Sequence, residues 1–365
     1  MKKASKALGT AYIDRRLDAS GERTFGELSG AFDQALAACR HELVSKTLQL
    51  AGHIVHVRIV GRALAAGLLA PFTHLEVTQG ASPALRIDAW DQQATGIGCS
   101  AVPAGPDLTG IGIVVRSAER RYFHLERSHS SMWLNDPDSH IMAWFAAASS
   151  LTIEERSKPF YRVLFPWLAR HRIKMIHAGL IARHGRGALV AGKGGAGKST
   201  SVLSCLAAGF ECLGDDYVGL GESGDATFTG FTLFSSCCIH RENMRRFPDL
   251  RSLVSEPNYP EEEKLMLALA DRFRDSFVAS VPISVILLPR IGGNRATSVH
   301  PASRVEALRS IAPSSLLLMP EATSDAFGLI ARLVDLVPTY WLELGGSRDE
   351  VPAAIGPLMD RLASG

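Results

Sequence analysis

The stretch GKGGAGKST at positions 192–200 combines the residue types that bind nucleotide phosphates. Its closely spaced glycines allow the backbone to point successive N–H groups toward one anion. The lysine that follows them can reach the terminal phosphates, and the next hydroxyl can ligate Mg²⁺. We therefore predict that ATP or GTP binds here with Mg²⁺. The predicted nucleotide-binding residues are Gly192, Lys193, Gly194, Gly195, Ala196, Gly197, Lys198, Ser199 and Thr200, with Ser199 as a metal ligand.

Two adjacent carboxylates, Asp215 and Asp216, form a second group of residues that could take part in catalysis. They follow the short apolar run 210–213 and begin 17 residues after Lys198. That interval fits one helix and a return strand, and a parallel crossover would bring the carboxylates to the sheet edge that holds the loop. One carboxylate could accept the proton of an attacking hydroxyl while the other acts near Mg²⁺. A solvated Asp-Asp turn is the alternative that the sequence leaves open.

A strand and a helix must position the glycine loop. The apolar run 187–191 before it is typical of a buried parallel strand. The residues after it place Val202, Leu203 and Leu206 at helical spacing, and Gly209 is suited to end the helix. The stretch 175–192 predicts two β segments joined by a polar turn. The loop lies at the end of the second segment and His177 at the start of the first.

The composition excludes several classes of protein. The chain has 365 residues, 46% of them hydrophobic, and a net charge of +2, which gives no basis for nucleic-acid or membrane-surface binding. Its six cysteines include no C-x-x-C pair, a pattern that suits a reducing cytoplasm. No apolar run reaches the length of a membrane span. We predict a cytoplasmic protein with no nucleic-acid or membrane partner, and a homo-oligomer stays open.

Changes in apolar periodicity suggest three parts. Residues 1–24 are expected to form a flexible polar arm, and 25–149 an accessory, substrate-binding domain of the α+β class that is mainly β. In that domain the pattern predicts one or two helices within 25–50 and short strands that include 53–61, 74–77 and 84–90. Residues 150–365 are expected to form an α/β catalytic domain with a P-loop. It opens with a helix over 150–173 that Thr152 would cap.

Over about residues 175–220 the chain resembles the catalytic domain of HPr kinase/phosphorylase. The resemblance rests on His177-Ala178-Gly179, the glycine loop and the stretch LGDDYV. Beyond that region the chain is closer to divergent bacterial HPr-kinase-like proteins, some of which phosphorylate a serine of a lasso-peptide precursor. The resemblance implies an HPr kinase C-terminal-domain-like fold and Mg²⁺–ATP-dependent transfer to a serine of a peptide or protein. It also implies that Asp215 is the catalytic base, Asp216 the metal-side carboxylate and His177 the histidine near that base.

Two further basic residues acquire a possible role through the same resemblance. Lys264 precedes an apolar stretch, and Arg290 ends the apolar strand expected within 281–293. Both resemble basic residues of the HPr-kinase-like proteins that would neutralise phosphate charge. The basic stretch 241–251 is either a solvated helix face or a contact for an acidic substrate or phosphate.

Other functions remain open beside a peptide or protein serine kinase. They are a kinase for a small hydroxylated molecule, a nucleotide-driven switch or ATPase, and a nucleotide-binding scaffold without turnover. A switch would normally carry a later apolar strand that ends in a lone Asp, whereas the stretch VILLPR ends in Arg290. This difference favours a kinase.

Overall fold

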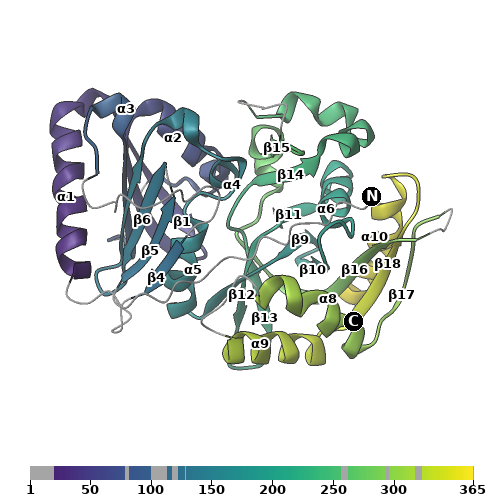
Figure 1. Ribbon diagram of the computed structural model, residues 1–365. Coiled ribbons are helices and arrows are strands. Elements are labelled where there is room, and N and C mark those ends of the chain that lie inside the picture. Colours follow the sequence, from purple (N-terminus) through teal and green to yellow (C-terminus); the bar gives the residue numbers. More distant parts are fainter. Residues whose placement is uncertain are drawn as a thin grey trace, which may run out of the picture.

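The computed structural model describes residues 20–78, 82–99, 113–116, 122–127, 129–255, 262–292, 296–316 and 323–364. These ranges form a mixed α/β fold built on two large sheets, one in each half of the chain (Figure 1). The helices are α1 (Ser20–Ala38), α2 (Arg62–Leu69), α3 (Gln92–Thr95), α4 (Ile153–Ser157), α5 (Tyr161–Arg170), α6 (Lys198–Ala207), α7 (Ala270–Phe273), α8 (Arg304–Leu316), α9 (Thr323–Leu336) and α10 (Glu350–Ser364).

In the described ranges the first sheet has seven strands in the order β1-β2-β3-β7-β6-β5-β4. The strands β2, β3 and β7 run parallel, and the other pairs are antiparallel. Its strands are β1 (Leu43–Leu50), β2 (His53–Val60), β3 (Leu85–Asp91), β4 (Ile113–Arg116), β5 (Tyr122–Arg127), β6 (Ser130–Asn135) and β7 (His140–Phe145).

The helix α1 covers one face of the first sheet because its apolar residues recur at helical spacing. Phe25, Leu28 and Phe32 are all buried there, in a cluster that includes Trp90 of β3 and Trp144 of β7. In Figure 1 this helix stands at the outer side of the N-terminal half, away from the second sheet.

The second sheet has nine strands in the described ranges, and parallel strands β10, β16 and β18 form its centre. One face packs on α6 and α10, the other on α8 and α9. Its strands are β8 (Ile173–Ile176), β9 (Ala178–Arg183), β10 (Arg186–Ala191), β11 (Glu211–Gly214), β12 (Val218–Glu222), β13 (Phe228–Phe231), β16 (Ser280–Ile291), β17 (Ser298–Pro301) and β18 (Thr339–Leu344).

A small third sheet stands beside the start of α6. It pairs β14 (Ser236–His240) with β15 (Lys264–Ala268) and continues into two 3-10 helices, η4 (Arg241–Arg246) and η5 (Pro248–Leu253). Buried residues of these elements, among them Ile239, Met244 and Leu250, share one apolar cluster with α6. The third sheet therefore shares a packed core with α6 and can form a wall of a site at the glycine loop.

The largest apolar core joins the two halves of the chain. Phe160, Leu164 and Trp167 of the α5 region are fully buried in the same cluster as strands of the first sheet. Met175 of β8 and Phe234, which follows β13, belong to this cluster as well. The structure does not test the predicted domain boundary at residue 150, so this boundary stays a prediction.

Several predicted elements differ from the structure. The segment expected to be helical over 25–50 contains α1, which already begins at Ser20, and then the strand β1. Of the run 74–77, His74 and Leu75 end a 3-10 helix, η2 (Ala70–Leu75), and Glu76 forms an isolated antiparallel bridge to Leu48 of β1 instead of a full strand. The helix predicted over 150–173 is interrupted between α4 and α5. Residues 1–19 of the predicted arm lie outside the described residues.

The predicted capping of α4 is confirmed. Thr152 accepts a hydrogen bond from the backbone N–H of Glu155, and the Glu155 side chain accepts one from the Thr152 N–H. Within the described ranges no helix combines the length and apolar character that crossing a membrane requires.

Candidate functional site

The glycine loop joins the buried strand β10 to the first turn of α6, as the sequence predicted. Gly197 occupies the position before α6 with φ +105°, a conformation that favours glycine. A β-carbon at Gly197 would lie 2.2 Å from Cδ1 of Leu344 in β18. Backbone conformation and close packing therefore both require glycine at this position.

Lys198, the first residue of α6, is folded back onto the loop. Its Nζ donates hydrogen bonds to the carbonyl oxygens of Gly192, at 2.8 Å, and Lys193, at 3.3 Å. Burial lowers the pKa of Lys198, and the nearby carboxylates of Asp215 and Asp216 partly oppose this shift. The ammonium group is thus held inside the loop, close to two acidic groups.

The strand β11 brings the aspartates to the loop. β11 and β10 both pair antiparallel with β9, so they run in the same direction with β9 between them. The predicted crossover is therefore confirmed, with one intervening strand. Beyond β11 the chain turns sharply, because Asp216 adopts φ +70°. Aspartate tolerates this left-handed conformation better than most residues.

Asp215 is the inner carboxylate. Its side chain is buried, and Oδ2 accepts a hydrogen bond of 3.1 Å from the thiol of Cys237 in β14. The other oxygen, Oδ1, is buried and has no hydrogen-bond partner among the described residues. Burial and the charge of Asp216 raise the pKa of Asp215, while the hydrogen bond from Cys237 and the nearby Ser199 hydroxyl oppose the rise.

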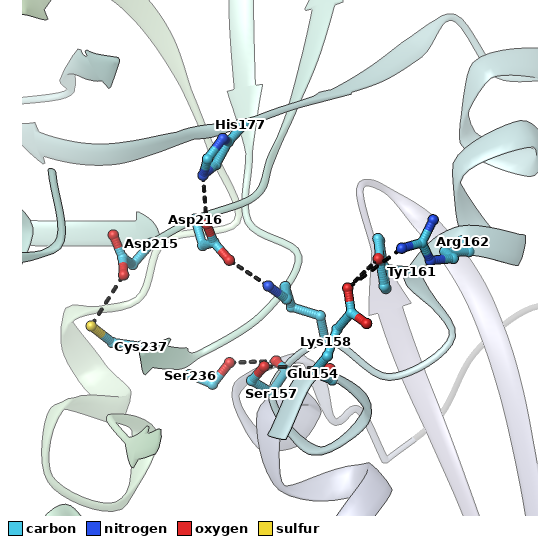
Figure 2. Close-up of polar contacts among 10 residues, drawn as sticks. All are labelled: Glu154, Ser157, Lys158, Tyr161, Arg162, His177, Asp215, Asp216, Ser236 and Cys237. Atoms are coloured by element: carbon cyan, nitrogen blue, oxygen red, sulfur yellow. Dashed lines mark hydrogen bonds and ion pairs between the residues drawn. The ribbon is translucent and has the colours of Figure 1, made fainter. Parts of the chain in front are cut away.

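Asp216 lies between two basic side chains (Figure 2). Its Oδ1 is 2.7 Å from His177 Nε2, and its Oδ2 accepts a hydrogen bond of 2.5 Å from Lys158 Nζ. Burial alone would raise the pKa of Asp216, but Lys158 and His177 together hold it well below its usual range. Asp216 is therefore an anion at neutral pH.

The ring of His177 contacts the second of the two aspartates. The resemblance implied that His177 stands near Asp215 as the base, whereas the structure pairs its ring with Asp216. The reason is local geometry: the positive φ at Asp216 turns its side chain toward the junction of β8 and β9, where His177 lies. The His177 backbone N–H donates to the Ser315 hydroxyl at 3.3 Å, which fixes the chain at this point.

A cavity of about 190 Å³ lies over the loop, and its walls come from several elements. His177, Lys198 and Asp216 line it. Lys264 of β15 lines it as well. The lining residues also include Gly194, Gly195, Gly197, Ser199, Thr200, Cys238, Ile239, His240, Asn243, Arg246, Ile291, Leu344, Gly345, Ser347, Arg348 and Val351.

Arg290 is not among the lining residues of this cavity. It forms an ion pair with Glu343 and lies over the ring of Trp341, 4.2 Å from its centroid. Arg246 supplies a positive charge to the cavity instead, which agrees with the phosphate or acidic-substrate alternative for the basic stretch 241–251. Arg348 is a further lining cation, held 2.5 Å from the carboxylate of Asp249.

The sequence did not reveal Lys158 or Arg348 as site residues. Lys158 lies 34 residues before Gly192 and belongs to no motif, so only the three-dimensional pairing with Asp216 identifies it. Arg348 follows a strand near the C-terminal end of the chain and reaches the cavity because β18 is adjacent to β16 in the sheet. Neither residue carried a sequence signal beyond its charge.

A magnesium ion bound with a nucleotide fits the residues present. The described residues contain no cluster of three or more His, Cys, Asp or Glu side chains arranged to hold a metal ion by themselves. Mg²⁺ in nucleotide sites, however, usually takes one or two protein ligands together with phosphate oxygens and water. The buried, unpaired Oδ1 of Asp215 and the nearby Ser199 hydroxyl are suitable donors of this kind.

Comparison with known proteins adds little. No protein-family model matches the chain, and no curated protein matches it in sequence. Among solved structures, one similar chain is the HPr(Ser) kinase/phosphatase from Coxiella burnetii. The two are 13% identical with a TM-score of 0.28, and the match covers 52% of this chain and 89% of that chain. A likeness of this size carries no weight, and the site is interpreted from its own residues.

Proposed function

We propose that this protein is a Mg²⁺–ATP-dependent kinase that transfers a phosphoryl group to a serine hydroxyl of a peptide or protein. The observation that carries the proposal is the shared cavity, which is lined both by the phosphate-binding loop and by the Asp216–His177 pair. A nucleotide-binding scaffold would need the loop alone. Phosphoryl transfer needs a loop for the phosphates and a carboxylate for the incoming hydroxyl in one place.

The loop and the cationic rim would bind the phosphates. Backbone N–H groups of the loop and the N-terminus of α6 favour negative charge. Lys198 would exchange its carbonyl contacts within the loop for phosphate oxygens, and Lys264 and Arg246 would add positive charge to the cavity. A volume of about 190 Å³ is below the roughly 300 Å³ of common ligand pockets, so it suits the triphosphate end of a nucleotide.

The geometry supports a division of labour between the carboxylates that reverses the one implied by the motif resemblance. Asp216 lines the cavity and is oriented by His177, so we assign it to the acceptor hydroxyl. Asp215 is buried next to Ser199 and has an unpaired oxygen, so we assign it with Ser199 to the metal. The low pKa of Asp216 is compatible with its role, because alignment and charge neutralisation dominate phosphoryl transfer.

Bound Mg²⁺ would supply charge neutralisation between the phosphates. The chain itself would perform the remaining work: Lys198 binds phosphate, Asp216 orients the hydroxyl and takes its proton, and the loop excludes water from the phosphates. The choice of serine in a peptide or protein rests on the resemblance of residues 175–220 to HPr-kinase-like sequences.

A binding and transfer experiment tests this function. The wild-type protein is titrated with Mg²⁺–ATP by calorimetry and then incubated with γ-labelled ATP and a degenerate serine-peptide library. We expect Mg²⁺-dependent binding and labelled phosphoserine from the wild type, and neither from Lys198→Ala. Binding of equal affinity by Lys198→Ala would contradict the phosphate role of the loop. If the wild type hydrolyses ATP but transfers phosphate neither to the peptides nor to a panel of free hydroxylated metabolites, the result would favour a switch or ATPase.

A further inference from the structure

Lys158 lies outside the predicted motifs, at the junction between α4 and α5. Its Nζ lies 2.5 Å from Oδ2 of Asp216, and its side chain is 14% exposed. Lys158 does not line the cavity itself, but it contacts Asp216, which does. Lys158 comes from a segment whose apolar face packs in the core of the first sheet.

The backbone around Lys158 is fixed from both sides. Its N–H donates to the Glu154 carbonyl at 2.9 Å, which ends the capped helix α4. One residue earlier, the Ser157 carbonyl accepts a hydrogen bond from the hydroxyl of Ser236 at the start of β14 (Figure 2). Beyond it, Pro159 and the positive φ of Phe160, +58°, break the helix. The backbone from which the Lys158 side chain extends is therefore held in place.

Aromatic rings hold the lysine side chain in place. Lys158 Nζ lies 4.8 Å from the centroid of the Tyr217 ring and 5.9 Å from that of Tyr161. Tyr217 stacks between Tyr161 and His177, with centroid distances of 5.4 and 5.5 Å. The Tyr161 hydroxyl donates to Glu154, which ties this stack back to α4. Cation–π contact in a desolvated setting favours the charged ammonium at this point.

We propose that Lys158 is a positioning residue that fixes the Asp216 carboxylate in the cavity and so makes the segment anchored in the N-terminal core part of the active site. The inference rests on the proposed function. Asp216 has two oxygens, and His177 engages one of them. By holding the second, Lys158 removes the rotation about the side-chain bond that a single contact would allow. The N-terminal half of the chain would thus contribute to catalysis through position, without touching substrate.

Four variants and one chemical probe test the inference. Lys158→Met keeps an unbranched apolar side chain and removes the ammonium group. Arg170→Met is the matched control on α5, since Arg170 is a half-exposed cation whose contacts are to Asp136 and Ser139 of the N-terminal half. Thermal melts confirm that each variant is folded. We expect Lys158→Met to bind Mg²⁺–ATP within about threefold of wild type while single-turnover transfer falls roughly 10- to 100-fold, as expected for a misplaced catalytic group. Arg170→Met should leave both quantities unchanged.

The double variant with Asp216→Asn separates positioning from a general structural effect. If Lys158 acts through Asp216, adding Lys158→Met to Asp216→Asn should cause no further loss of transfer. Independent losses that multiply would overturn the proposal, as would wild-type turnover by Lys158→Met.

Acylation by an amine-reactive reagent, followed by mass spectrometry, gives a readout that needs no activity. In the wild type Lys158 should react at least about tenfold more slowly than the exposed Lys264, and Asp216→Asn should remove most of that protection. Equal rates at Lys158 and Lys264 in the wild type would overturn the proposal. If the wild-type chain binds Mg²⁺–ATP but transfers no phosphate, the proposed function is overturned instead. The ratio of the acylation rates at Lys158 and Lys264 would still decide whether Lys158 holds Asp216.

Discussion

His177 Nε2 lies 2.7 Å from Oδ1 of Asp216, so the outer of the two adjacent aspartates, and not the inner one, is oriented by the histidine. Asp215 instead accepts a hydrogen bond from Cys237 and leaves its second oxygen buried and unpaired among the described residues. One carboxylate is thus held in the cavity by two basic side chains, while its neighbour is held behind the loop by a thiol. The two aspartates should respond differently to the same substitution.

The first prediction concerns Asp215 and the metal. Asp215→Asn removes the charge of the carboxylate assigned to Mg²⁺ with Ser199, and the Cys237 contact can persist to the amide oxygen. We expect the Mg²⁺ concentration for half-maximal ATP binding to rise at least about tenfold, as for other weakened metal sites. Metal titrations followed by calorimetry check this. An unchanged Mg²⁺ requirement would remove Asp215 from the metal site.

The second prediction concerns the glycine before α6. Gly197→Ala places a β-carbon against Leu344 and forces alanine into φ +105°. Strain of about 1–3 kcal/mol, expressed in the loop, should weaken Mg²⁺–ATP binding by roughly tenfold or more. Gly185→Ala is the control, because a β-carbon there meets nothing within 4 Å and Gly185 does not line the cavity. Equal affinities for the two variants would show that the loop adapts and that Gly197 is not required.

The third prediction concerns pH and stability through His74. Its ring lies 2.8 Å from the Thr232 hydroxyl, at a contact between the two halves of the chain. Burial, together with the charge of Arg274, lowers the pKa of His74 to about 3, from 6.5 when unfolded. The unfolded chain therefore binds a proton that the folded chain does not, and stability is lost as pH falls below about 6.5.

The loss through His74 should reach at most about 1.4 kcal/mol per pH unit between pH 6.5 and 4. His74→Gln cannot titrate but keeps a hydrogen-bonding group, so its stability should fall less steeply over that range. Urea unfolding at pH 7, 6 and 5 measures the difference. Parallel pH profiles for wild type and variant would contradict the predicted neutral state of His74.

The fourth prediction concerns cooperativity between the two halves. Trp167 is fully buried in α5, within a core that includes residues of both sheets. Trp167→Ala should cost about 3–5 kcal/mol, the usual range for removing a buried aromatic side chain. Because the core is shared, calorimetry of the full chain should show one unfolding transition, shifted as a whole in the variant. Two transitions, only one of them shifted, would support the division at residue 150 that the sequence suggested.

The sequence predicted the parts of the site that lie within one continuous motif. The glycine loop, the strand before it and the helix after it follow from residue spacing, and the crossover to Asp215 follows from the length between them. The capping of α4 by Thr152 was also readable, because a capping box involves residues only three apart.

Other features depended on contacts that spacing cannot encode. The strand β1 was predicted as helix because its pairing with β2 depends on the two-residue turn at Ala51 and Gly52. Both turn residues have positive φ, +47° and +85°, as a type I′ turn requires, but alanine gives no such signal. Lys158 and Arg348 became site residues only through packing between distant segments. Arg290 lies at the end of an apolar strand, as its predicted role required, but it forms an ion pair with Glu343 on the adjacent strand.

The fifth prediction, and the most direct test of the proposed chemistry, is single-turnover transfer from labelled Mg²⁺–ATP to a serine peptide selected from the library, compared between wild type and Asp216→Asn. Base catalysis typically contributes about 10²–10⁴-fold, so Asp216→Asn should lose transfer by that factor while its ATP affinity, measured separately, stays within a few-fold of wild type. If Asp216→Asn transfers at close to the wild-type rate while Asp215→Asn loses transfer with its Mg²⁺ affinity intact, the inner carboxylate is the base and the assignment made here is wrong.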